Sequence, residues 1–191
     1  MSYQVQTMTE RELIQIFKIE ENHFNDFKAK DISGKKFSKS VSAFANASGG
    51  DIYLGIREEV DTKIKHWEGF QSIEDANSFI QVLDSISGVE TFYELDFLKH
   101  PELNTYVVKV TVFKTDSIIY TTDNRIFVRK GAQSLPVDTP EKLRRLELDK
   151  GISSYENETV AESEITDATE SEIYKRFSTA IIPETEPQKW L

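Results

Sequence analysis

The stretch Ser42–Gly55 reads SAFANASGGDIYLG, and it joins the end of a helix to the start of a strand. The apolar residues around its beginning recur at a helical period, which predicts a helix over Lys35–Ala47. Gly49 and Gly50 end that helix, because glycine adopts the left-handed conformation that closes many helices. The next segment, Asp51–Glu58, is predicted to be a buried strand. A helix and a strand joined so closely are expected to pack together.

Helices and strands alternate on both sides of this turn. Thr9 followed by Glu12 is a capping box that predicts a helix over Thr9–Ile19, and His23–Lys30 is predicted to be a strand. The other expected elements are a helix over Ser72–Ser85, strands over Phe92–Leu98, Thr105–Phe113, Ser117–Thr121 and Arg125–Arg129, and a helix over Pro140–Asp149. This order predicts a mixed sheet with helices packed on it, in the α/β (α+β) class.

The composition excludes several classes of site. The 191-residue chain has no cysteine, which rules out disulfides, thiolate metal sites and a cysteine nucleophile. It has no P-loop, GxGxxG, HExxH or GxSxG motif, and its three histidines are scattered. No apolar stretch approaches the ~20 residues that a membrane helix needs, so a cytoplasmic protein is expected.

Charge separates a body from a tail. The chain has 33 acidic and 23 basic residues, a net charge of −10. Residues 151–191 hold nine acidic and three basic residues, so more than half of the negative excess lies in the tail. We therefore predict a domain over residues 1–150 and an acidic, partly disordered linker over residues 151–191, with a short helix near 170–177. The final segment IIPETEPQKWL predicts docking to a protein partner or self-association.

Acidic residues close two of the predicted elements. Glu20 and Glu21 follow the first helix, Asp26 lies on the next strand, and Glu58 and Glu59 end the strand after the glycines. If these two strands pair, the acids converge at one end of the sheet. Their oxygens would then suit Mg²⁺ or Mn²⁺, which can activate water against a phosphodiester. The other interpretation is that they are ordinary solvated acids, and spacing leaves both open.

A local excess of positive charge lies beside those acids. Residues 28–39 have a net charge of +4 from Lys28, Lys30, Lys35, Lys36 and Lys39 with Asp31. Lys35 and Lys39 share one helix face, and cations beside a helix N-terminus favour phosphate binding. A second cluster at the end of the last predicted strand consists of Arg125, Arg129 and Lys130. These are either solvated faces or contacts for a nucleic-acid backbone.

Four motifs follow one another along the body. They are Glu21…Asp26-Phe27-Lys28, Ala43-Phe44-Ala45-Asn46…Gly49-Gly50, Gly55-Ile56-Arg57-Glu58 and Ile126–Ser134. In this order the chain resembles the Schlafen AlbA-type domain family, over roughly residues 15–148. The resemblance implies an Alba-like fold. For some members it also implies a metal-dependent ribonuclease that cuts tRNA or rRNA through three carboxylates.

The resemblance assigns the catalytic and metal-binding roles to Glu21, Asp26 and Glu58, with Mg²⁺ or Mn²⁺ as the cofactor. Asp26 departs from the glutamate that is usual there, and its side chain is one methylene shorter. Arg57 stands where many relatives carry another acid, so we expect it to pair with these carboxylates or to contact a phosphate. Active relatives use two lobes, so the resemblance implies that a single lobe would either need a homodimer or bind without cutting.

Two functions follow from the sequence. As an enzyme, the domain would cut structured RNA such as tRNA. As a non-catalytic module of a regulatory or defence protein, it would bind nucleic acid or a nucleotide, or oligomerise. In both, nucleic acid is the expected partner, with RNA favoured over DNA. The residues predicted to hold it are Lys28, Lys35, Lys39, Arg57, Arg129 and Lys130. Asn46, Gly49 and Gly50 are predicted to be structural, with Asn46 bonded to the turn backbone.

Overall fold

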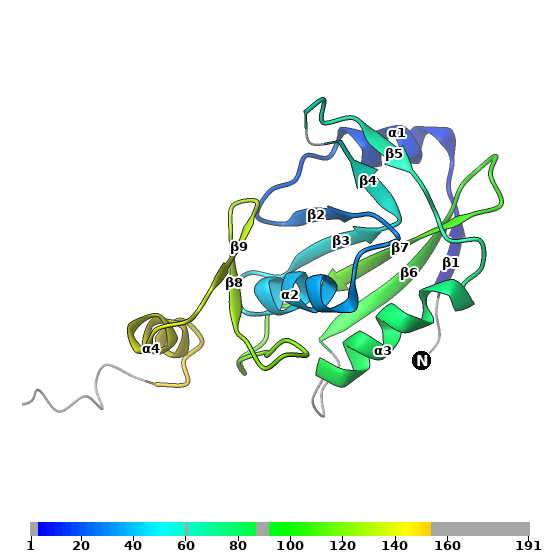
Figure 1. Ribbon diagram of the computed structural model, residues 1–191. Coiled ribbons are helices and arrows are strands. Elements are labelled where there is room, and N and C mark those ends of the chain that lie inside the picture. Colours follow the sequence, from blue (N-terminus) through cyan, green and yellow to red (C-terminus); the bar gives the residue numbers. More distant parts are fainter. Residues whose placement is uncertain (1–3, 60, 87–91, 154–191) are drawn as a thin grey trace, which may run out of the picture. The chain divides into compact units, whose positions relative to one another are not determined.

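The computed structural model describes residues 4–59, 61–86 and 92–153 (Figure 1). A compact unit ends at Ser153. The predicted helix near 170–177 and nearly all of the predicted tail lie outside the described residues. No helix in the described ranges is long and apolar enough to cross a membrane.

The main sheet is mixed, as predicted, and has five strands in the order β1-β6-β7-β3-β2. In that order the strands span Gln4–Thr7, Tyr93–Lys99, Tyr106–Val112, Gly50–Leu54 and Asn25–Lys28. β1 pairs with β6 and β2 pairs with β3 in parallel, whereas the central pairs β6–β7 and β7–β3 are antiparallel. β2 is therefore an edge strand with one free side.

Successive residues of each strand point to opposite faces, and both faces of this sheet are covered. Helices α2 (Gly34–Ala45) and α3 (Asn77–Ile86) lie on one face, where Phe44 packs with Ile52 and Val110 (Figure 1). On the other face, α1 (Glu10–Lys18) packs around Phe27 and Tyr53. The alternation explains why neighbouring residues of β2 enter different environments.

The turn between α2 and β3 has the predicted geometry. Gly49 has φ 75° and its N–H donates to the Phe44 carbonyl at 3.0 Å. Gly50 has φ 150°, and a Cβ placed there would lie 2.5 Å from the Phe24 carbonyl oxygen and 2.5 Å from the Phe44 ring. Both positions therefore require glycine. A Cβ at either one would clash with a backbone oxygen, and both φ values are strained for a residue with a side chain.

The predicted strand Asp51–Glu58 is divided at Gly55, which has φ 99°. β3 stops at Leu54, and β4 (Ile56–Glu58) leaves the main sheet to pair with β5 (Lys65–Trp67). The division changes the direction of the chain, so Glu58 and Arg57 extend beyond the edge of the main sheet.

Other helix predictions agree closely with the structure. The capping box of α1 is present, since Thr9 and Glu12 bond reciprocally. The helix predicted over Ser72–Ser85 begins as a 3₁₀ turn over Glu74–Ala76 and continues as α3. The final helix, α4, spans Pro140–Asp149 as predicted.

The prediction of a strand over Ser117–Thr121 is wrong. That segment makes only an isolated bridge between Tyr120 and Ile126, and the backbone of Ile119 bonds instead to the side chain of Asn46, which caps α2. β8 (Phe127–Lys130) pairs with β9 (Gln133–Pro136), which was not predicted, and this β8–β9 hairpin lies beside α2 (Figure 1). β1 and β5 were also missed.

Candidate nucleic-acid interface

A cavity of about 830 Å³ lies along the free side of β2, between α2, β4 and the β8–β9 hairpin. We call it the β2-edge cavity. Its charged lining residues are Glu21, Asp26, Asp31, Glu58, Lys28, Lys36, Lys39, Arg57, Lys63 and Arg129. The three predicted catalytic acids therefore line one space, although only Asp26 lies in the main sheet.

Asp26 is the most buried of the three acids, with 2% of its side chain exposed. It faces α2, where the Ser40 hydroxyl donates to it at 3.0 Å. The Lys28 ammonium donates to its other oxygen at 2.7 Å, and the Arg129 guanidinium lies 3.6 Å from that oxygen. These contacts compensate its negative charge within the protein.

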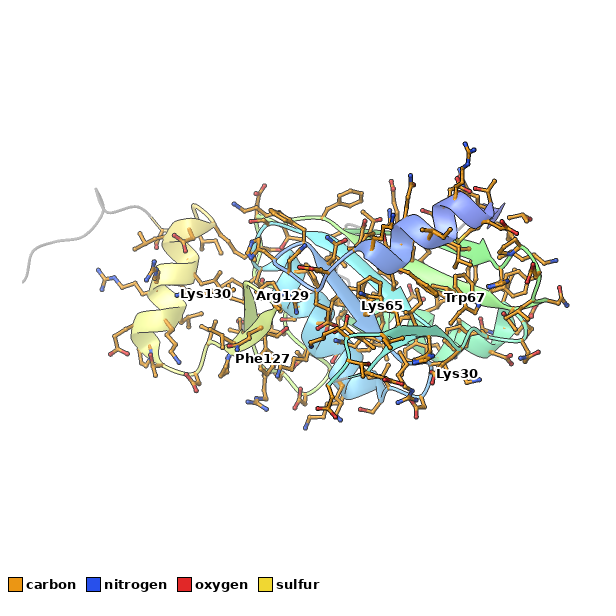
Figure 2. The ribbon with its side chains drawn as sticks, turned by 90° about the horizontal axis from the view of Figure 1, so that it is seen from above. Lys30, Lys65, Trp67, Phe127, Arg129 and Lys130 are labelled. Carbon is orange, nitrogen blue, oxygen red and sulfur yellow. The ribbon has the colours of Figure 1, made fainter. Side chains whose placement is uncertain are left out.

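Glu58 is held between two ammonium groups. The Nζ atoms of Lys63 and Lys65 lie 3.2 and 3.1 Å from its two carboxylate oxygens. Lys65 comes from β5, has only 5% of its side chain exposed, and also lies over the Phe27 ring at 4.6 Å (Figure 2). The charge of Glu58 is thus compensated by two lysines at the β4–β5 pair, so Glu58 does not face the cavity as an unpaired carboxylate.

Glu21 precedes β2, and its carboxylate accepts a hydrogen bond from a backbone N–H at the edge of that strand. Its Oε1 accepts the Phe27 N–H at 3.2 Å. Burial raises the pKa of the Glu21 carboxyl above its ordinary value, and the nearby charge of Asp26 raises it further, with a smaller effect from Glu58. The three acids therefore lie within electrostatic reach of one another.

In their present contacts these acids do not form a metal site. Within the described ranges, no three histidine, aspartate or glutamate side chains are grouped so that they could hold one. Asp26 and Glu58 already have cationic partners at hydrogen-bonding distance. An incoming Mg²⁺ or Mn²⁺ would have to displace those ammonium groups, so the predicted cofactor stays a prediction.

The positive side chains that line the cavity differ in whether they already form ion pairs within the protein. Lys28 is paired with Asp26. Arg57 pairs with Glu68 and with Asp31, the latter at 3.0 Å, and not with the three predicted catalytic acids. Among the residues that the structure describes, neither Lys36 nor Lys39 forms an ion pair, and both project from α2.

Three other predicted contacts have different surroundings. Lys35 lies outside the cavity and pairs with Asp123 at 2.8 Å. Arg129 lines the cavity but is buried, donating to the Asn22 and Asn25 carbonyls. Lys130, the next residue, lies on the α4 side of the β8–β9 hairpin (Figure 2). Arg129 thus anchors the hairpin to β2.

The Asn46 amide bonds to partners other than the predicted turn backbone. Its Nδ2 donates to the Ile119 and Phe127 carbonyls at 2.8 and 3.0 Å, and its Oδ1 accepts the Ile119 N–H at 2.9 Å. Ser42 shares the same partners, since its hydroxyl donates to the Ile119 carbonyl at 2.7 Å. The amide connects α2 to the segment before β8 instead of to the Gly49–Gly50 turn.

Sequence reasoning missed the two lysines that pair with Glu58, Lys63 and Lys65. The local sequence KIKHW does not alternate polar and apolar residues, so it gave no clear strand signal. It missed Ser40 as well, because a serine inside a helix gives no indication of a distant carboxylate partner.

Two solved structures show a distant similarity to this chain. One is a crystal structure of a Corynebacterium diphtheriae protein, at 19% identity and TM-score 0.46, which covers 71% of this chain and 30% of that protein. The other is the solution structure of the N-terminal domain of a RecG-related ATP-dependent DNA helicase protein from Nitrosomonas europaea. It has 16% identity and TM-score 0.45, covering 67% of this chain and 86% of that domain.

The search of curated proteins found no match. The family model described as Schlafen, AlbA_2 matches residues 21–138, which is more than half of the chain. This match supports a nucleic-acid-associated domain. The chain therefore belongs to the Schlafen AlbA_2 family.

Proposed function

We propose that this domain is a nucleic-acid-binding module that holds a phosphate backbone in the β2-edge cavity. The observation that carries the proposal is the charge of the lining, which has six cationic and four acidic side chains. The acids Asp26 and Glu58 are neutralised within the protein. The unpaired ammonium groups of Lys36 and Lys39 are thus left to attract phosphates.

The start of α2 adds to this attraction. Ser33, which caps the helix, and Lys36 in its first turn both line the cavity. The N-terminal end of a helix carries partial positive charge and so favours a bound anion. Lys39 lies one turn further along and covers the Phe127 ring at 4.9 Å. The ammonium groups of Lys36 and Lys39 and the N-terminal end of α2 therefore face the same cavity.

Binding is tested by fluorescence anisotropy of the full chain with labelled tRNA and with labelled single-stranded DNA. We expect salt-sensitive binding that the double variant Lys36→Ala and Lys39→Ala weakens on the order of tenfold, because two phosphate contacts are lost. Arg11→Ala with Lys18→Ala is the matched control, since both are exposed and line neither cavity that the structure shows. Absence of salt-sensitive binding to either nucleic acid contradicts the proposal.

Metal-dependent cleavage of structured RNA is the second candidate. It is favoured by one observation, namely that Glu21, Asp26 and Glu58 line the same cavity. The test incubates the protein with tRNA in Mn²⁺, in Mg²⁺ and in EDTA, beside the variants Glu21→Gln and Glu58→Gln. Cutting that needs a metal and disappears in both variants would replace the binding-only proposal. Cutting that persists in both would exclude this carboxylate assignment.

A further inference from the structure

A second cavity, of about 560 Å³, lies on the other side of the β8–β9 hairpin. It is enclosed by the hairpin, the end of α2 and helix α4, and we call it the hairpin–α4 cavity. Its charged lining residues are Lys114, Arg129, Lys130, Lys142, Arg145, Lys150 and Asp149. Six cations against one acid make it more positive than the β2-edge cavity.

Three of these cations are engaged inside the protein. Arg129 donates to carbonyls before and within β2. Lys142 pairs with Asp138 at 2.6 Å. The Lys150 ammonium is buried and donates to the Ala45 and Thr115 carbonyls at 3.2 and 2.6 Å. The Lys150 contacts hold the end of α4 against the end of α2, which gives the cavity one fixed wall.

The other three cations are available to a ligand. Lys114, Lys130 and Arg145 are exposed, and none of them forms an ion pair with another described residue. They come from the segment after β7, from the hairpin and from α4, so they surround the cavity from three sides. Convergence of unpaired cations from separate elements favours a ligand with several negative charges.

The buried Lys150 also favours a negatively charged ligand. Burial, together with the positive charge of Lys114, lowers the pKa of Lys150 to about 8, against an opposite effect of the Asp116 charge. Its contacts are carbonyl and hydroxyl oxygens rather than a carboxylate. An anion in the cavity would stabilise the charged form of this ammonium.

The two cavities share one residue and are separated by one hairpin. Arg129 lines both. On the hairpin, Ala132 and Ser134 line the β2-edge cavity, while Lys130 and Leu135 line the hairpin–α4 cavity. A ligand that enters both cavities must cross the β8–β9 hairpin.

We propose that the hairpin–α4 cavity is a second phosphate-contact site for the same nucleic-acid strand that occupies the β2-edge cavity. This inference rests on the proposed function. A continuous strand would contact Lys36 and Lys39 on one side of the hairpin and Lys114, Lys130 and Arg145 on the other. Among the described residues, the cavity wall offers Val128, Leu135 and Val137 but no aromatic ring, so recognition there is of the backbone and tolerates any sequence.

The test is the dependence of affinity on strand length. Labelled single-stranded RNA and DNA oligonucleotides of mixed sequence, from about 6 to about 24 nucleotides, are titrated with the full chain at several salt concentrations. The test variant combines Lys114→Gln, Lys130→Gln and Arg145→Gln. The control variant combines Arg11→Gln, Lys18→Gln and Lys99→Gln, which removes the same charge from residues outside both cavities.

For the native chain and the control, we expect affinity to rise with length. Because the β2-edge cavity remains intact, the test variant should lose less affinity for the shortest strands, which fit one cavity at a time, than for the longest. For the longest strands it should lose about tenfold in affinity and about 2 from the salt slope, because three phosphate contacts are removed. If the test variant and the native chain have equal affinity and equal salt dependence at every strand length, this inference is overturned and the proposed function is left intact.

Two other results are also decisive. Equal weakening of short and long strands by the test variant contradicts a separate second site. If the native chain binds no strand at any length, the proposed function fails, and this inference fails with it. Thermal unfolding of the variants, compared with the native chain, verifies that each one is folded.

Discussion

The polar residues around Asn46 and those of the β2-edge cavity both depend on α2, yet their hydrogen bonding is different. We use the name Asn46 network for Ser42, Asn46 and the backbone of Ile119 and Phe127 that they contact. In that network every side-chain partner is a neutral group. In the cavity the partners are mostly full charges, and Lys36 and Lys39 have no anionic partner among the described residues.

This difference separates structure from binding. A buried neutral network that is fully satisfied stabilises one arrangement of the chain and has no capacity left for a ligand. A partly exposed set of charges with an excess of one sign remains able to bind the opposite sign. The motif that identifies the family is therefore mainly structural, whereas the less distinctive lysines are the candidates for contacting a ligand.

The largest expected effect is that of Gly50→Ala. The new Cβ would lie 2.5 Å from the Phe24 carbonyl oxygen and from the Phe44 ring. We expect a loss of about 3–5 kcal/mol in the free energy of unfolding, measured by urea denaturation, since backbone must move. Gly131→Ala is the control, because Gly131 has φ 57° with nothing within 4 Å and should cost about 1 kcal/mol. Equal losses in the two variants would show that crowding at Gly50 is unimportant.

The next effect is that of Asn46→Ala. It removes the hydrogen bonds to Ile119 and Phe127 and leaves their buried backbone groups without partners. We expect a loss of about 2–4 kcal/mol in the free energy of unfolding. Asn46→Asp keeps the shape but loses the donors, and should be similarly destabilised at neutral pH. If Asn46→Asp were as stable as the native chain, the network would not depend on the two donor bonds.

A smaller loss is expected when Glu58 is deprived of its buried partner. Lys65→Met retains the apolar stem over Phe27 but removes the ammonium. We expect a loss of about 1–3 kcal/mol at pH 7, because an acid would keep only the exposed Lys63 as its cation. Adding Glu58→Gln should restore part of that loss. Absence of any restoration in the double variant would contradict pairing as the role of Lys65.

The smallest effect is a gain in stability in Glu21→Gln. Since the pKa of Glu21 is raised in the folded chain, folding favours its protonated form. The stabilisation from that form is complete below the ordinary value of 4.5 and is lost as pH rises through the raised pKa. Glutamine stays neutral and can still accept the Phe27 N–H.

The variant should therefore be more stable at pH 7 by a few tenths of a kcal/mol to about 1 kcal/mol, with solvent screening keeping the effect small. The difference should vanish below pH 4.5. The measurement is the melting temperature of both chains as a function of pH. A native chain that is the more stable one at pH 7 would mean that the carboxylate contributes a favourable interaction in the folded state.

Local sequence determined much of the fold of this protein. The Gly49–Gly50 turn, the capping box of α1 and the proline at the start of α4 act over a few residues, so they specify their elements directly. The periodicity of α2 likewise follows from residues that share one face. The family motifs also brought Glu21, Asp26 and Glu58 together as candidates, and they do line one cavity.

Tertiary structure alone decided what those side chains contact. Glu58 meets Lys65 because Gly55 redirects the chain, Asp26 meets Ser40 because α2 covers β2, and Arg129 meets β2 because the hairpin lies beside it. The partner of Asn46, Ile119, is 73 residues away along the chain. Hydrogen bonds and ion pairs act over a few ångströms in space, whereas sequence patterns report only neighbours along the chain. The pairing of charges, and with it which lysines remain free for a ligand, is therefore set by packing.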